Sequence, residues 1–360
     1  MKFLIPPLSL LLLTACVGVL PEPEADLNTF GVDSLPDEYS QRTFDQFSAS
    51  DWLGSFKSAD LNFLVEKAIK SNRTLAQEAA AVRLAEQNVR ISDSTLWPNL
   101  GLSLSTQRDD TGMGSATQSG LSLTAGYEVD LWGRLNALQQ QSQIDLASQK
   151  ASYREAERTL VRDVVNAGFD ASSATQLLGL LNQRFTNLTE SLDVIERGYR
   201  SGLNDALDVY LSRNTLELER AGIANQQQIH FEALTRLELL LGDYPAAKLA
   251  VSANLQSLHL DPIAAGIPAN LLSRRSDIQQ AWLELLSADA GVAIAHRNRF
   301  PTLNLSSSLS DSSQELDELL DGGSLMWRVA ASLIQPLFQG GRLAALEEQA
   351  KIRLEQREKR

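Results

Sequence analysis

Four segments of the sequence alternate between apolar residues and small polar residues with a period of two. In the first, Leu100, Leu102 and Leu104 are separated by Gly and Ser, and the same alternation continues over residues 121–131. Two further segments, 303–309 and 325–333, repeat the pattern more weakly. Because successive side chains of a strand point to opposite faces, this pattern predicts four β-strands, each with one apolar face and one polar face.

The sequence between the two pairs of strands has helical composition. Residues 135–241 are rich in Ala, Gln, Leu and Glu and almost free of Pro, which predicts a long helical hairpin. We expect the tip of this hairpin at a cluster of small residues, Ala171, Ser172, Ser173 and Ala174, and a break in the returning arm at 198–202. A free-standing coiled coil that acts as a spacer is the alternative interpretation of this region.

The chain contains two copies of one unit. Pro98 in RISDSTLWPNLGLSLS corresponds to Pro301 in AIAHRNRFPTLNLSSS, an offset of 203 residues. Arg134 in YEVDLWGRLNAL corresponds to Arg342 in LIQPLFQGGRLAAL, an offset of 208. Each copy therefore runs helix, Pro, strand, loop, strand, Gly-Arg, helix. The helix before each Pro should end just in front of it, because Pro disfavours the helical conformation of the preceding residue.

The predicted strands have the length and alternation of transmembrane strands. Ten residues at about 3.3 Å each, tilted by about 40°, cover roughly the 25 Å of the apolar band in membrane β-barrels. A soluble sheet with one wet face shows the same alternation and stays open as an alternative. Since membrane barrels begin at eight strands, four strands in lipid require other chains to close the wall. Glu128, Asp130 and Arg328 would then face the lumen, and a ring of carboxylates there would favour cations.

The amino terminus resembles an export signal. MKFLIPPLSLLLLTAC has one Lys, an apolar run and small residues before Cys16, and it is too short for a permanent membrane helix. Its last four residues resemble the lipobox of bacterial lipoproteins, in which the signal is cleaved before Cys and that Cys is acylated. An ordinary buried Cys is the alternative. Val17, where an Asp would favour the inner membrane in such lipoproteins, favours the outer membrane.

Composition and motifs argue against other classes of function. The chain has 360 residues, a net charge of -13 and scattered basic residues, which disfavours nucleic-acid binding, and its one Cys excludes an intrachain disulfide. His230, His259 and His296 have no metal-ligand spacing, and Asp109 and Asp110 are expected in a solvated loop. No phosphate loop or nucleophile motif is present. We therefore expect no catalytic residues, no metal and no cofactor.

Four motifs together resemble the TolC-like outer-membrane factors, in particular their lipoprotein branch in tripartite, RND-type efflux systems. They are LLSRRSDI at 271–278, RFPTL at 299–303, QPLFQGGRL at 335–343 and RGYRSGLNDALDVYLSRNTL at 197–216. By this resemblance the last motif is the element that crosses the family's equatorial belt.

The resemblance implies an α+β membrane protein with long α-helical hairpins and four transmembrane β-strands per chain, in two internal repeats. It implies a homotrimer with a twelve-stranded barrel in outer-membrane lipid and a helical barrel in the periplasm. The channel would be a passive exit duct for drugs or other small molecules. A periplasmic membrane-fusion adaptor and an inner-membrane transporter would be its partners, and residues 171–174 would contact the adaptor.

The expected organisation has nine segments. They are a signal peptide (1–15), a lipidated tether (16–57), the first helices of repeat 1 (58–97), its transmembrane β-hairpin (98–132), its long helical hairpin (133–242), a connector (243–270), the first helix of repeat 2 (271–300), its β-hairpin (301–340) and the start of its second helix (341–360).

Two features depart from the family pattern. Ser276 stands where Pro is usual, a mild change because Ser also suits a helix start. In addition, 107 residues separate Arg134 from Leu241 but only 18 follow Arg342, so about 89 residues of a second hairpin are expected to be absent. Such a C-terminally truncated chain should not close a helical tunnel alone. A periplasmic coiled-coil structural lipoprotein, or a non-functional fragment of such a channel, is the alternative function.

Overall fold

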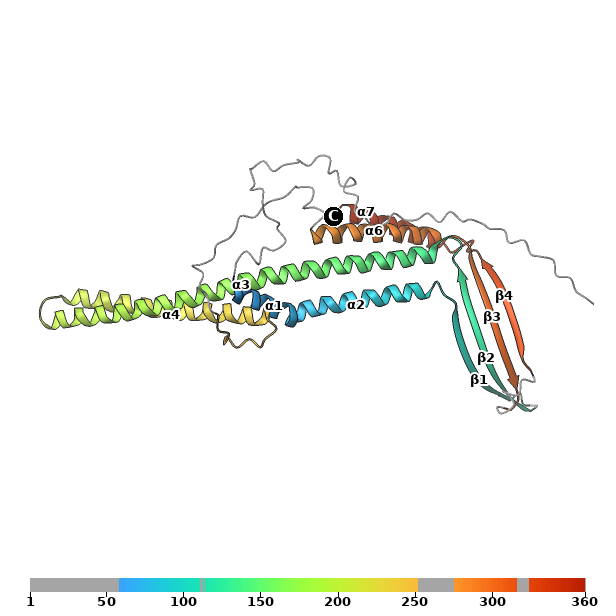
Figure 1. Ribbon diagram of the computed structural model, residues 1–360, viewed down its shortest axis with the longest axis horizontal. Coiled ribbons are helices and arrows are strands. Elements are labelled where there is room, and N and C mark those ends of the chain that lie inside the picture. The colour runs from blue at the N-terminus through green and yellow to red at the C-terminus, as the bar shows by residue number, and fades with distance from the viewer. Residues whose placement is uncertain (1–57, 111, 113, 252–274, 316–323, 360) are drawn as a thin grey trace, which may run out of the picture. The chain divides into compact units, whose positions relative to one another are not determined.

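The computed structural model describes residues 58–110, 112, 114–251, 275–315 and 324–359 (Figure 1). The predicted combination of long helices with four antiparallel strands is confirmed. In chain order the elements are α1 (Ala59–Ser71), α2 (Arg73–Ser94), β1 (Asn99–Asp110), β2 (Ser115–Val129), α3 (Arg134–Arg200), α4 (Ala206–Leu240), α6 (Ser276–Arg297), β3 (Thr302–Ser313), β4 (Met326–Ile334) and α7 (Arg342–Glu358).

The chain divides into two compact units. Among the described residues, the first unit contains 82–110, 112, 114–150, 278–315 and 324–359, with all four strands, and the second contains 58–81, 151–251 and 275–277. No helix in the described part of the chain is both long enough and apolar enough to cross a membrane.

The core of the second unit joins α1 and the start of α2 to α3 and α4. α1 buries Leu61, Leu64, Val65 and Ala68 at the spacing of one helical face. Gly168 of α3 lets this face approach closely, because a Cβ there would lie 3.3 Å from a methyl group of Leu61. The buried cluster comprises Leu64, Val65, Ala68, Leu75, Leu160, Val164, Val165, Ala167, Ala171, Leu234, Leu237 and Leu241.

The hairpin tip predicted at residues 171–174 is wrong. α3 is one continuous helix of 67 residues that passes through this cluster, and the turn to α4 lies at residues 201–205 (Figure 1). Ala171, Ser172 and Ala174 are buried, and the side-chain nitrogen of Gln226 donates to the Ala174 carbonyl at 3.3 Å. The small residues therefore allow α3 and α4 to pack closely. They do not interrupt α3.

The motif at 197–216 forms this turn and not a belt element. Gly202 adopts a left-handed conformation with φ 76°, which a turn between antiparallel helices requires. Asp205 and Asp208 form a reciprocal capping box that starts α4. Arg213 of α4 donates two hydrogen bonds to Glu196 of α3, at 2.7 and 3.1 Å, and so ties the two arms together just beside the turn.

Two polar side chains organise the ends of α1, α2 and α4. Asn72 lies between α1 and α2, where its side-chain oxygen accepts from the Leu75 N–H at 2.9 Å and its nitrogen donates to the Leu240 carbonyl at 2.9 Å. Glu238 of α4 accepts hydrogen bonds from four backbone N–H groups at 246–249, between 2.6 and 3.0 Å. Burial alone would raise the pKa of Glu238, but these four donors outweigh it and lower the pKa.

We expect Gly242→Ala to destabilise the second unit. Gly242 follows α4 at φ 76°, and a Cβ there would overlap the Ser71 carbonyl oxygen. The strain and overlap should cost roughly 2 kcal/mol. Gly179→Ala is the control: it lies in α3 with nothing within 4 Å of the new Cβ, and it should gain about 1 kcal/mol of helix stability. Thermal unfolding followed by far-ultraviolet circular dichroism measures both, and equal melting temperatures would contradict the expectation.

Candidate functional site

The apolar residues of the four strands share one exposed face of the sheet. The strands are antiparallel in the order β1-β2-β3-β4. Their register puts Leu102, Leu123, Leu309 and Trp327 opposite one another in one row. These side chains are 72%, 43%, 41% and 78% exposed, and Val329 is also exposed. The strands therefore do not form the core of a soluble subunit, which would bury such a row.

The opposite face of the sheet carries mainly small polar residues. Gly101, Thr124 and Ser308 form one cross-strand row on this face, which Arg328 continues on β4. Glu128 lies on the same face, opposite Asn304 of β3. One apolar face and one small polar face are typical of strands that separate lipid from a water-filled lumen.

β1 and β4 form the two edges of the sheet. Among the described strands each has a single neighbour, so one side of each backbone is not paired within the sheet. An edge of this kind can pair with a strand of another chain. In hydrocarbon an unpaired backbone group costs several kcal/mol, so a sheet in lipid must have its edges paired.

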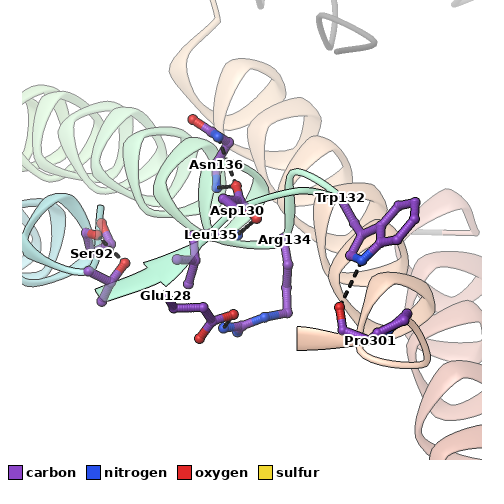
Figure 2. Close-up of polar contacts among 9 residues, drawn as sticks. Ser92, Glu128, Asp130, Trp132, Arg134, Leu135, Asn136 and Pro301 are labelled. Carbon is purple, nitrogen blue, oxygen red and sulfur yellow. Dashed lines mark hydrogen bonds and ion pairs between the residues drawn. The ribbon is translucent and has the colours of Figure 1, made fainter. Parts of the chain in front are cut away.

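Two carboxylates hold the corner between β2 and α3 (Figure 2). Glu128 accepts a hydrogen bond from the guanidinium of Arg134 at 2.7 Å. Asp130 accepts from the backbone N–H groups of Leu135 at 3.1 Å and Asn136 at 2.9 Å. Asp130 thus satisfies N–H groups in the first turn of α3 that have no partner within the helix.

This corner corrects the prediction for the lumen carboxylates. β2 ends at Val129, so Asp130 is not a strand residue, and its oxygens are used in capping α3. Glu128 is paired with Arg134. Neither is a free carboxylate, and the cation preference inferred from them loses its physical basis. The sequence did not predict this helix cap, because the alternation of apolar and polar residues continues to residue 131, two residues beyond the end of β2.

Three contacts join this corner to the junction between α6 and β3 in the second repeat. The indole N–H of Trp132 donates to the Pro301 carbonyl at 2.7 Å (Figure 2), and its ring stacks on Phe300 with centroids 5.3 Å apart. Arg297, at the end of α6, donates to the Gly133 carbonyl at 2.7 Å. None of these contacts was predicted. The sequence signal for them is weak: Trp132 directly precedes the Gly133-Arg134 pair, and Arg297 lies four residues before Pro301.

The corresponding corner between β4 and α7 is built differently. Gly341 precedes α7 at φ 82° and has no side-chain capping bond. By the offset of 208, Pro336 takes the place of Glu128, and Arg342 instead donates to the side-chain oxygen of Gln339 at 2.6 and 3.1 Å. The second corner therefore lacks the ion pair and the carboxylate cap of the first.

Glu347 anchors α7 to α6 instead. Its side chain is largely buried and accepts hydrogen bonds from Arg299 at 2.7 Å and from His296 at 3.3 Å. The ammonium group of Lys351 forms an ion pair with it at 3.2 Å. The hydrogen bonds from Arg299 and Lys351, followed by that from His296, lower the pKa of Glu347 to about 2, against the opposing effect of burial.

The remaining candidates from the sequence do not form a reactive site. Asp109 and Asp110 end β1 and are not in a loop. His230 contacts Thr175, His296 contacts Glu347, and His259 lies outside the described residues. Within the described ranges no group of three or more His, Cys, Asp or Glu side chains could hold a metal ion.

The profile of the family described as outer membrane efflux protein matches residues 64–243 and 267–360 of this chain, which is more than half of its length. The chain belongs to the outer membrane efflux protein family. The exposed apolar face, the open sheet edges and the long helices are thus features of an efflux-family subunit.

Relatives in this family resemble the chain over most of its length. It is 28% identical over 315 residues to the cation efflux system protein CusC of Escherichia coli O6:H1 (strain CFT073). This alignment covers 87% of the present chain and 68% of the relative. It is 29% identical over 300 residues to the toluene efflux pump outer membrane protein TtgF of Pseudomonas putida, covering 81% and 62%. The chain thus spans about two thirds of the length of these relatives.

A solved structure has the same fold. The CmeC outer membrane channel of Campylobacter jejuni superposes with a TM-score of 0.81 at 21% identity, over 89% of this chain and 71% of that one. Cys16, the predicted lipidation site of this efflux-family protein, lies outside the described residues.

We expect the stability contributed by Glu347 to depend on pH. Its pKa is lowered from 4.5 to about 2 in the folded chain, so ionised Glu347 stabilises the fold above about pH 4.5. This contribution is lost as the pH falls from 4.5 towards 2. The melting temperature of Glu347→Gln should therefore be below that of the wild type at pH 7, and the gap should close in acid. Glu348→Gln, at the exposed neighbouring position, is the matched control. A gap that does not change with pH would disprove the role of this carboxylate.

Proposed function

We propose that this chain is a subunit of an outer-membrane channel through which an efflux system exports small molecules. The observation that carries the proposal is the apolar face exposed across all four strands, opposite a face of small polar residues. Apolar surface of this extent on a strand-built face fits lipid, and the small polar face fits a water-filled lumen. The channel is a passive duct.

The strand lengths support a membrane span. β1 and β3 have 12 residues each and β2 has 15. Twelve residues tilted by about 40° rise by about 30 Å, enough for the apolar band of about 25 Å in membrane barrels. β4 is shorter, with 9 described residues, and ends at Ile334 ahead of Pro336.

Closure of the wall requires further copies of the chain. The two edges, β1 and β4, would pair with β4 and β1 of neighbouring copies, and three copies would give twelve strands. The number three follows from the family resemblance, whereas the minimum of eight strands in a membrane barrel requires only more than one copy. A homotrimer in outer-membrane lipid is thus part of the proposal, as is acylation of Cys16 as an additional anchor.

The turn between α3 and α4 replaces residues 171–174 as the proposed contact for a periplasmic adaptor. Leu203, Leu207 and Tyr210 at this turn are 82%, 61% and 68% exposed, as is common for residues that bind a protein partner. An inner-membrane transporter would supply the energy. The names of two relatives indicate different cargoes, cations in one case and toluene in the other.

The alternative function, a helical periplasmic spacer, leaves the sheet unexplained. A spacer needs no four-stranded sheet whose apolar residues face outward in register. The exposed row of Leu102, Leu123, Leu309 and Trp327 would make such a protein prone to aggregation in water.

Two adjacent substitutions test lipid contact. Leu123→Arg puts a charge on the apolar face at the middle of the sheet, which should cost about 2–4 kcal/mol if that face touches hydrocarbon. Ser122→Arg puts the same charge on the polar face, where water is available. We expect Leu123→Arg to be lost from washed outer membranes and Ser122→Arg to be retained. Equal recovery of the two variants in the membrane fraction would argue against a membrane barrel.

A further inference from the structure

A groove runs along three helices of the first unit. The start of α3, one face of α6 and one face of α7 surround a volume of about 740 Å³. All residues that line it belong to this unit. Pockets that bind small molecules commonly measure roughly 300–1,000 Å³. The groove therefore has room for a small organic molecule.

The two repeats are related by fixed offsets in the structure as well as in the sequence. Leu102 pairs with Leu123 in the first hairpin, and Leu305, 203 residues after Leu102, pairs with Ala331 in the second. Leu123 therefore corresponds to Ala331, an offset of 208 residues. This is also the offset between the Gly-Arg pairs that start α3 and α7. Equivalent positions of these two helices can thus be compared directly.

Equivalent residues of the two repeats line the groove. Leu138 and Gln141 contribute from α3, and Leu346 and Gln349 contribute from α7. Each leucine and each glutamine of α3 lies 208 residues before its counterpart in α7. The two helices therefore offer the groove the same pair of groups, one apolar side chain and one amide.

The helix α6 provides the rest of the lining and contacts both of the other helices. Gln141 of α3 donates to the Ser287 carbonyl at 3.1 Å, and the Ser287 hydroxyl donates to Asp145 at 2.5 Å. Arg357 of α7 donates to Glu284 at 2.5 Å. These contacts hold the three helices together, so the groove is preformed. The residues of α6 between these contacts and its end are mostly small or apolar, and those that line the groove include Ala288, Gly291, Ile294 and Ala295.

Several polar groups of the groove are free to bind a ligand. The side chains of Gln349 and Asn298 make no hydrogen bond to any residue that the structure describes. Arg353 likewise has no ion pair within the described ranges, whereas Arg357, the other guanidinium of the groove, is paired with Glu284. The lining therefore combines apolar surface, free amides and one uncompensated positive charge.

The groove lies on the side of α3 that continues the polar face of the sheet. Arg134, the first residue of α3, reaches Glu128 on that polar face (Figure 2). Leu138 and Gln141 follow Arg134 by four and seven residues, so they lie on the same side of the helix. In the proposed channel the polar face lines the duct, and a ligand reaches the groove from the lumen.

Resting on the proposed channel, we infer that this groove is a cargo-binding site in the wall of the duct and that its ligand is a small amphipathic organic anion. Leu138, Ile294 and Leu346 contact the apolar part of the ligand. The Arg353 guanidinium binds its anionic group, and the free amides donate to its remaining polar atoms. A cation is disfavoured, because Glu284, the carboxylate of the lining, is already paired.

A charge variant tests the class of ligand. Naphthalenesulfonate is the probe and neutral naphthol is its comparison, and isothermal titration calorimetry measures their binding to the purified full-length chain in non-ionic detergent, after subtraction of detergent alone. Arg353→Gln should weaken sulfonate binding about fivefold, as expected for a partly exposed ion pair, and leave naphthol binding unchanged. Arg83→Gln is the matched control, because Arg83 of α2 is exposed, lies outside the lining and makes no ion pair within the described residues.

A bulky side chain tests the place of binding. Gln349→Trp fills the groove from α7 and should abolish binding of naphthalenesulfonate. Glu348→Trp is the matched control, at a neighbouring position outside the lining that lies about 100° around the helix. Both positions are exposed, so the far-ultraviolet melting temperature of each variant should match that of the wild type.

The outcomes separate the groove from the channel. Binding that is weakened in Arg353→Gln and lost in Gln349→Trp, but kept in both controls, is the expected result. Absent binding in the wild type, or binding unchanged in both groove variants, would overturn the site. It would leave the channel standing, because the recovery of Leu123→Arg and Ser122→Arg in outer membranes is measured separately. Equal weakening of sulfonate and naphthol in Arg353→Gln would overturn the anionic class of ligand.

Discussion

The structure depends on one constraint, which is that every backbone N–H and C=O group of a sheet in hydrocarbon must be hydrogen-bonded. The chain provides four strands with an apolar face exposed over their whole width, yet it leaves β1 and β4 as edges. In the proposed channel, a single copy with the described strands alone would leave these edges unpaired in lipid. Pairing with further copies, as proposed above, meets this constraint.

The change from strand to helix is the second determining feature. After β2, the chain must turn and start α3 at once, and Gly133 at φ 74° with Asp130 as the cap makes this possible. Glu128 and Asp130, which were predicted as lumen residues, thus join β2 to α3. Their chemistry is structural, since each one pairs with a donor at the start of α3.

The two repeats have diverged at these corners. The first relies on Asp130, Glu128 and Trp132, while the second starts α7 from Gly341 without a side-chain cap and relies on Glu347. Equivalent backbone positions are therefore stabilised by different side chains. The two repeats share their Gly-Arg positions and their strand register, and the polar contacts around this common backbone are free to differ.

The sequence alone determined the strands, the repeat offsets and the family, because period-two alternation and repeated Pro and Gly-Arg positions are local signals. It misplaced the helical turn, since a cluster of Ala and Ser is compatible both with a turn and with close helix packing, and only the contact of α3 with α4 decides between them. The roles of Asp130, Arg297 and Glu347 likewise depended on tertiary structure. Their partners lie at the start of α3, in the other repeat and just beyond the end of α6, respectively. Hydrogen bonds over such distances leave no periodic trace in a sequence, whereas burial and exposure along a single strand do.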